Sequence, residues 1–144
     1  MFSLNLERKL ATNPALAFDA FTEPDLVIHW FAPGDMMVSD AILDFRRDGR
    51  FCVVRQEPTG DLCIVRGQYL EIVENEALRF SWQLGQGDRT SEVAISFSQV
   101  EQDKTLISLA HQGFVEQEHK DIHLQGWTGC LDKLQGLFEM KGRC

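Results

Sequence analysis

Short turns divide the segment from residue 36 to residue 112 into stretches that show no helical period. The turn signals are Asp48-Gly49, Glu57 to Gly60, Glu74 to Glu76, Gly85 to Arg89 and Gln102-Asp103. A parallel crossover needs about a dozen residues, so connections this short join antiparallel neighbours. The segment therefore predicts a series of antiparallel strands, which run from Met36 to Arg46, Arg50 to Gln56, Leu62 to Val73, Leu78 to Leu84, Ser91 to Val100 and Thr105 to Gln112.

One more strand and two short helices are predicted before this series. Apolar and polar residues alternate from Phe2 to Glu7, which is the period of a half-buried strand. Asn13-Pro14 is a helix start, with Asn as the cap and Pro at the first helical position, and the pattern continues to Phe21. A second short helix is predicted from Pro24 to Phe31, where Pro33-Gly34 stops it.

The chain returns to a helical period after Gly113 and keeps it to about Phe138. Apolar residues recur there at three- and four-residue steps, at Leu124, Trp127, Leu131, Leu134 and Phe138. Such a helix has one large apolar surface to pack on, the inner face of the sheet. The predicted architecture is thus α+β, with a seven-stranded antiparallel sheet and a long C-terminal helix.

Three glycines interrupt this last helix, at positions 126, 129 and 136. Each costs about 0.5 to 1 kcal/mol relative to alanine in a helix interior, so the sequence needs a compensating reason for them. One interpretation is that the glycines let the helix approach its neighbours closely. The other is that the missing side chains leave a void of ligand size beside Trp127, since ligand pockets are mostly apolar.

Strand alternation indicates which side chains would line such a void. Phe80 and Trp82 share one face of their strand, as do Leu109 and His111. Leu131 follows Trp127 by four residues and so points the same way from the helix. The candidate ligand-binding residues are therefore Trp82, His111 and Trp127, with Phe80, Leu109 and Leu131 beside them.

Charge and hydropathy exclude several function classes. The net charge is -8 and the pI is near 4.9, without a cluster of Lys and Arg, so no nucleic-acid partner is expected. No apolar run could insert in a membrane, and Glu7, Arg8 and Lys9 stand where a signal peptide would be apolar. The expected location is the cytoplasm.

A length of 144 residues predicts a single domain, residues 1–144.

Asp44 and Arg46 share a face of their predicted strand, and two interpretations stay open. Either both charges point to water, or the pair points inward and Arg46 anchors an anionic group of a ligand through bidentate contacts. His111 has a similar ambiguity, because it would either hydrogen-bond a ligand or serve as a satisfied core histidine. No nucleophile stands beside it in sequence, so no catalytic residue is predicted.

Metal and cofactor sites are not expected. His119 and His123 are four residues apart and would face the same way, as helical zinc pairs do, but a third ligand is missing from the motif. No phosphate loop and no nucleophile elbow are present. The four cysteines contain no CxxC pair and are predicted to be free thiols, namely Cys52, Cys63, Cys130 and Cys144.

Five blocks, in this order and spacing, carry a resemblance that covers nearly the whole chain. They are PALAFDAFTEPDLVIHWFAP from Pro14, DFRRDGRF from Asp44, GQYLEIVENEALRFSW from Gly67, TLISLAHQGF from Thr105 and GWTGCLDKL from Gly126. They resemble the START-like (SRPBCC) superfamily, and within it the family named for the activator of the ninety-kilodalton heat-shock protein ATPase. The resemblance implies a helix-grip fold, in which a curved seven-stranded sheet wraps the final helix and often leaves a cavity.

Two departures from the family matter. The family pattern has two glycines where this chain has Asp48-Gly49. The two-domain co-chaperone that gives the family its name also has an amino-terminal domain that does much of the chaperone binding, and these 144 residues have no room for it. We therefore predict that the chain binds a hydrophobic small molecule. The alternatives are an interaction module that contacts a chaperone or a second copy of itself, and an enzyme acting on an apolar substrate.

Overall fold

The computed structural model describes residues 1–85 and 90–141, with side chains through residue 139. The order of elements agrees with the sequence prediction. They are β1 (Phe2–Leu10), α1 (Pro14–Thr22), α2 (Pro24–Val27), β2 (Met37–Leu43), β3 (Arg50–Gln56), β4 (Leu62–Val73), β5 (Ala77–Leu84), β6 (Ser91–Glu101), β7 (Lys104–Phe114) and α3 (Gln117–Lys141).

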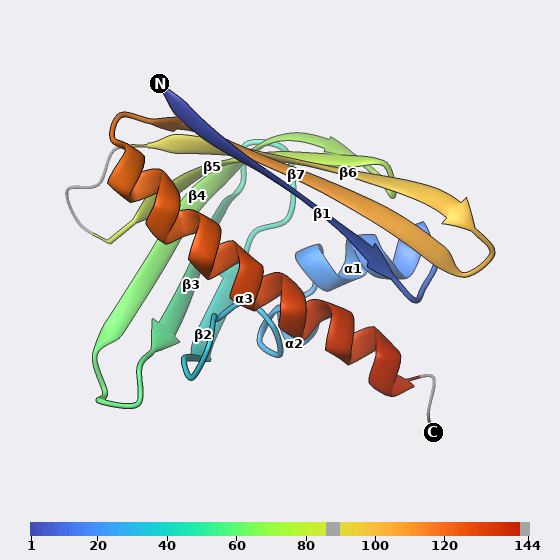
Figure 1. The fold of residues 1–144 in the computed structure, drawn as a ribbon, viewed down its shortest axis with the longest axis horizontal. Helices are drawn as coiled ribbons and strands as arrows, with labels where there is room; N and C mark the ends of the chain where they lie inside the picture. The colour runs from blue at the N-terminus through green and yellow to red at the C-terminus, as the bar shows by residue number, and fades with distance from the viewer. Residues whose placement is uncertain (86–89, 142–144) are drawn as a thin grey trace.

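The strands form one seven-stranded sheet in the order β1-β7-β6-β5-β4-β3-β2, and every neighbouring pair is antiparallel (Figure 1). Hairpins connect β2 through β7 in sequence order, as the short turns require. The strand β1 forms the edge of the sheet opposite β2, and it pairs with β7, the last strand in the chain. The sheet is curved, and its inner face carries the apolar side chains.

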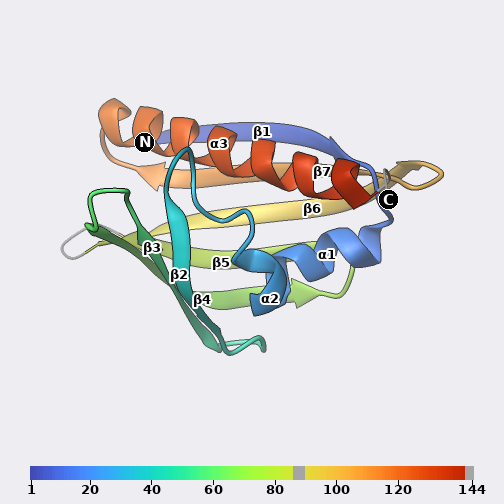
Figure 2. The ribbon, with the colours of Figure 1, turned by 90° about the horizontal axis from the view of Figure 1, so that it is seen from below.

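All three helices cover that inner face (Figure 2). The helix α3 lies over β1 and β7, α1 contacts β6 and β7, and α2 contacts β2 at the other edge. Buried side chains from both layers form one core, which includes Phe18, Phe21, Trp30, Leu78, Phe97, Ile107, Leu131, Leu134 and Phe138. This is the α+β helix-grip arrangement that the resemblance implied.

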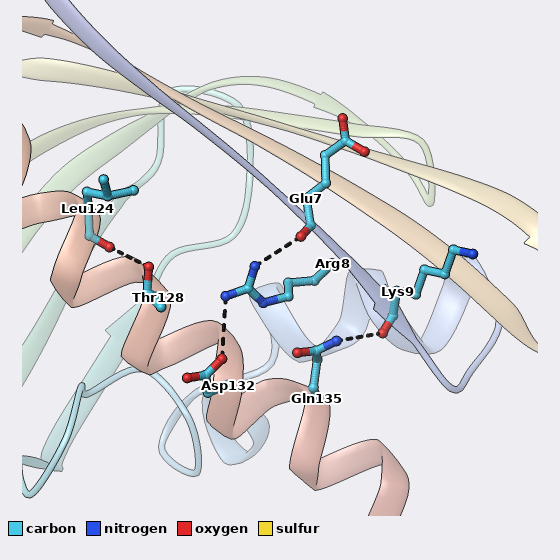
Figure 3. Close-up of polar contacts among 7 residues, drawn as sticks. All are labelled: Glu7, Arg8, Lys9, Leu124, Thr128, Asp132 and Gln135. Carbon is cyan, nitrogen blue, oxygen red and sulfur yellow. Dashed lines mark hydrogen bonds and ion pairs between the residues drawn. The ribbon is translucent and has the colours of Figure 1, made fainter.

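Polar contacts fasten α3 to the edge strand β1 (Figure 3). The Arg8 guanidinium donates to the Asp132 carboxylate at 3.4 Å, and the Gln135 side-chain amide donates to the Lys9 carbonyl at 3.1 Å. The second bond satisfies a carbonyl of an edge strand, which has no strand partner on that side. The position of α3 over the sheet is thus set by side chains along the middle of the helix.

The sequence prediction differs from the structure where side-chain packing overrides local pattern. The helix predicted from Pro24 to Phe31 ends at Val27. Beyond it the chain turns so that the Trp30 indole donates to the Ala20 carbonyl at 2.8 Å and packs against Phe21. The burial of two large rings is worth more than one further helical turn.

A second difference lies before the β2–β3 turn, where the strand predicted to reach Arg46 ends at Leu43. Asp48 adopts a φ of 67°, the left-handed conformation that the family glycine would supply and that Asp tolerates. Gly49 follows, and a Cβ there would meet the Asp44 carbonyl oxygen at 2.0 Å. Of the two glycines in the family pattern, this chain therefore keeps Gly49, where the turn leaves no space for a side chain.

Candidate functional site

A pocket of about 600 Å³ lies between the sheet and α3. The sheet contributes side chains from the ends of β3, β4 and β5, the helix contributes the stretch from Ile122 to Asp132, and the segment after α2 closes a third side. Apolar and aromatic groups make up most of its wall, with Phe31, Trp82 and Trp127 among them. Its volume falls within the range of pockets that bind small molecules.

Three aromatic rings of the wall contact one another. Trp82 stacks on Phe31, with ring centroids 5.9 Å apart, and lies 5.1 Å from Trp127. Phe31 and Trp127 are 5.6 Å apart. Each ring comes from a different part of the chain, namely the segment after α2, the strand β5 and the helix α3. The pocket therefore depends on the assembled fold and on no single motif.

The glycines of α3 serve different purposes. A Cβ on Gly129 would lie 3.0 Å from the Pro33 Cβ, so this glycine lets the loop after α2 approach the helix closely. A Cβ on Gly126 or Gly136 would meet nothing within 4 Å. Gly126 lines the pocket, so the side chain missing there leaves open space beside Trp127. Close approach thus explains Gly129, and open space lies at Gly126.

His111 lies beside this wall in the core, fully shielded from solvent. Its Nδ1 accepts a hydrogen bond from the Trp127 indole at 3.0 Å, and its Nε2 is 2.7 Å from the Ser91 hydroxyl. Burial, and next the nearby His123, lower the pKa of His111 to about 3. The imidazole is therefore neutral, and it is the satisfied core histidine of the two alternatives.

The structure brings Ser91 next to His111, a pairing that the sequence did not reveal. An indole N–H can only donate, so Nδ1 of His111 is the acceptor and the proton of the neutral ring sits on Nε2. Nε2 then donates to Ser91, whose hydroxyl points to the Trp82 carbonyl at 3.5 Å. A general base would need a free lone pair at Nε2, so this tautomer does not activate Ser91 as a nucleophile.

Arg55 of β3 is a charged side chain of the pocket that the sequence analysis missed. Only 6% of the residue is exposed. Its Nη2 donates to the Cys63 sulfur at 3.2 Å. Burial raises the pKa of the Cys130 thiol on α3 to about 11, and the nearby charge of Arg55 opposes that rise. The signal for Arg55 was present, because it continues the alternation of the buried Phe51 and Val53.

Among the predicted site residues, Trp82 and Trp127 line the pocket, while the others lie elsewhere. Phe80, Leu109 and Leu131 are buried in the packed core. Arg46 is mostly exposed and forms an ion pair with Asp44 at 2.9 Å. The outward interpretation of that pair holds, because the chain leaves the strand after Leu43 and turns into solvent.

The two histidines of α3, His119 and His123, do not point to a common site. His119 is exposed, whereas His123 is buried and its Nδ1 is 2.7 Å from the His119 carbonyl oxygen. Within residues 1–85 and 90–141, no group of three or more His, Cys, Asp or Glu side chains could hold a metal ion. Cys52, Cys63 and Cys130 are free thiols, and Cys144 lies outside the described residues.

Comparison with known families decides where the chain belongs. Residues 11–139 match the family described as Activator of Hsp90 ATPase homolog 1-like protein. The chain belongs to this family. The match spans every element from α1 to α3, and it includes the whole pocket wall. No curated protein matches the sequence.

Solved structures share the fold of this family member. The AHSA1 protein from Silicibacter pomeroyi is 25% identical, with a TM-score of 0.86 over 97% of this chain and 99% of that one. A protein from Nitrosomonas europaea is 23% identical, with a TM-score of 0.84 over 99% and 97%. One from Chromobacterium violaceum is 20% identical, with a TM-score of 0.85 over 95% and 96%. No described helix is both long and apolar enough to cross a membrane.

Proposed function

We propose that this protein binds a hydrophobic small molecule in the pocket between the sheet and α3. The aromatic wall carries the proposal, because three rings in mutual contact line a pocket that the described side chains leave open. Gly126 supports it, since it lines the pocket and a side chain there would occupy the open space. A cytoplasmic location and binding without turnover belong to the same proposal.

A matched pair of helix variants tests the proposal. Gly126→Leu would place a side chain in the pocket, while Gly136→Leu adds the same side chain to the same helix at a position that does not line it. The probe is N-phenyl-1-naphthylamine, an uncharged apolar dye. We expect the native protein and Gly136→Leu to bind it saturably, with energy transfer from tryptophan, and Gly126→Leu to bind at least about tenfold more weakly.

Equal binding by all three proteins would place the dye elsewhere and contradict the proposal. Absence of saturable binding to the native protein would do so as well. Circular dichroism of each variant separates loss of the pocket from loss of the fold. Stability is not expected to fall at either position, because an added Cβ meets no neighbour and leucine is a better helix former than glycine.

Family membership favours a second function, interaction with a chaperone. The family takes its name from an activator of the Hsp90 ATPase, so this function predicts that the purified protein changes the ATPase rate of purified Hsp90. The effect would persist in Gly126→Leu, because the contact would involve the outer surface and not the pocket. An unchanged ATPase rate at saturating protein would count against it.

A further inference from the structure

We infer that the ligand of the pocket is an amphipathic carboxylic acid and that Arg55 binds its carboxylate. The inference rests on the proposed binding function and names the chemical class of the ligand. Arg55 reaches the pocket from β3, and the aromatic wall provides the surface for the apolar part of the molecule. The acid would therefore lie with its apolar body against the wall and its carboxylate at Arg55.

Burial of Arg55 is the first observation. The guanidinium of an arginine carries one positive charge. Only 6% of the residue is exposed, so water solvates little of this charge. A buried charge without a counter-charge is strongly unfavourable, and buried arginines are normally paired. A site that keeps such a residue needs an anion.

No described residue supplies that anion. Within residues 1–85 and 90–141, Arg55 forms no ion pair, and its hydrogen bond there goes to the sulfur of Cys63, which is a weak acceptor. Asp132 also lines the pocket, but its side chain is 65% exposed and is paired with Arg8 of β1. The buried positive charge of Arg55 therefore has no counter-charge among the described residues, and a bound anion would provide one.

Two hydrogen-bond donors of the pocket wall strengthen the inference. Among the described residues, neither Nε of Arg55 nor Nε1 of Trp82 has a hydrogen-bond partner, and both atoms are buried. A buried donor left unsatisfied is destabilising, so both call for an acceptor. Oxygen atoms of a bound acid would satisfy them, and a carboxylate matches the planar fork of the guanidinium.

The surroundings favour a monoanion over a phosphate. Lys133 of α3 is a further cation close to Cys130 of the pocket wall, and its ammonium donates to the carbonyls of Ala32 and Met36, the second at 3.2 Å. Arg55 is thus the one cation available at the wall among the described residues, with the Asp132 carboxylate at its rim. One positive charge balances one carboxylate and leaves a doubly charged phosphate in excess.

The test compares an acid with its own ester. Pyrenebutyric acid and its methyl ester share the same apolar ring, and tryptophan emission overlaps pyrene absorption, so energy transfer reports binding of either. We expect the native protein to bind the acid on the order of tenfold to a hundredfold more tightly than the ester. Arg55→Met, which keeps an unbranched apolar side chain without the charged guanidinium, should bind both with the affinity of the ester.

Two further variants complete the comparison. Arg66→Met removes an exposed arginine from the neighbouring strand β4, and it should keep the full preference for the acid. Arg55→Lys keeps the charge without the planar fork, and it should keep part of the preference. Removal of a buried, unpaired charge does not threaten the fold, so Arg55→Met should unfold at a urea concentration no lower than that of the native protein.

The results that overturn the inference differ from those that overturn the binding function. Equal affinity of the native protein for acid and ester, or an undiminished preference in Arg55→Met, would contradict the role of Arg55 while the pocket remained a binding site. If the native protein bound neither compound, the binding function itself would fail. Loss of the preference in Arg66→Met would show that general surface charge, and not the buried arginine, selects the acid.

Discussion

His111 shows how a single residue can look like part of a reactive site and still belong to the core. Its two ring nitrogens are committed to the Trp127 indole and the Ser91 hydroxyl, and no water reaches it. The bond from Trp127 determines which nitrogen carries the proton. His111 thus fixes the orientation of a ring that forms the pocket wall, and it acts through Trp127 without lining the pocket itself.

This role gives the protein a specific dependence on pH. A histidine in the unfolded chain has a pKa near 6.5, whereas burial and His123 lower the pKa of His111 to about 3. Below about pH 6.5 His111 becomes protonated in the unfolded chain but stays neutral in the folded one. The free energy of unfolding therefore falls as the pH drops towards 3. The contribution of His111 to this loss should reach about 2 kcal/mol at pH 5.

Urea unfolding of the native protein and of His111→Gln at pH 7 and pH 5 measures this contribution. Glutamine can accept from Trp127 and donate to Ser91, but it does not titrate. The variant should therefore lose about 2 kcal/mol less than the native protein between the two pH values. The same loss in both proteins would mean that His111 is protonated in the folded state.

Arg55 and Arg46 show which site residues a sequence can reveal. Trp82 and Trp127 follow regular alternation and helical periodicity, and both line the pocket. Arg55 follows the same alternation, but an arginine near a strand end is usually solvated, so its burial depends on neighbours from α3 that the sequence does not place. Arg46 lies beyond the end of β2, where alternation no longer determines direction.

At the scale of elements, α3 combines close packing and open space within one helix. Gly129 faces Pro33 at a distance that leaves no room for a side chain, whereas Gly126 and Gly136 face open space. The sequence predicted the helix and its apolar face correctly, because the three- and four-residue steps are regular. It could not assign a purpose to each glycine, since that depends on the loop after α2.

Alanine at two of these glycines should have opposite effects on stability. Gly136→Ala should raise the free energy of unfolding by about 0.5 to 1 kcal/mol, because it restricts the unfolded chain and meets no neighbour. Gly129→Ala should lower it, because the new Cβ would lie 3.0 Å from Pro33 Cβ and 3.3 Å from Pro33 Cα. Urea unfolding of both variants checks this, and equal stabilisation would contradict the close approach.

At the scale of the whole molecule, the curved sheet and α3 enclose one packed core with the pocket at its margin. Leu131 and Phe138 belong to that core, His111 is buried behind the pocket wall, and the pocket lies where α3 reaches the ends of β3 to β5. The five sequence blocks predicted this architecture, because turn spacing and strand alternation determine the sheet. The contents of the pocket depend on contacts between distant segments, which no local pattern encodes.

The indole N–H signals of the three tryptophans test the binding pocket most directly. Nitrogen-15 spectra of the native protein are recorded during titration with pyrenebutyric acid, and Trp→Phe variants assign each signal. We expect the signals of Trp82 and Trp127 to shift saturably, because the ring of the probe lies against both. The signal of Trp30, whose indole N–H donates to the Ala20 carbonyl and does not line the pocket, should shift much less. Unchanged Trp82 and Trp127 signals at saturating probe would contradict a ligand site between the sheet and α3.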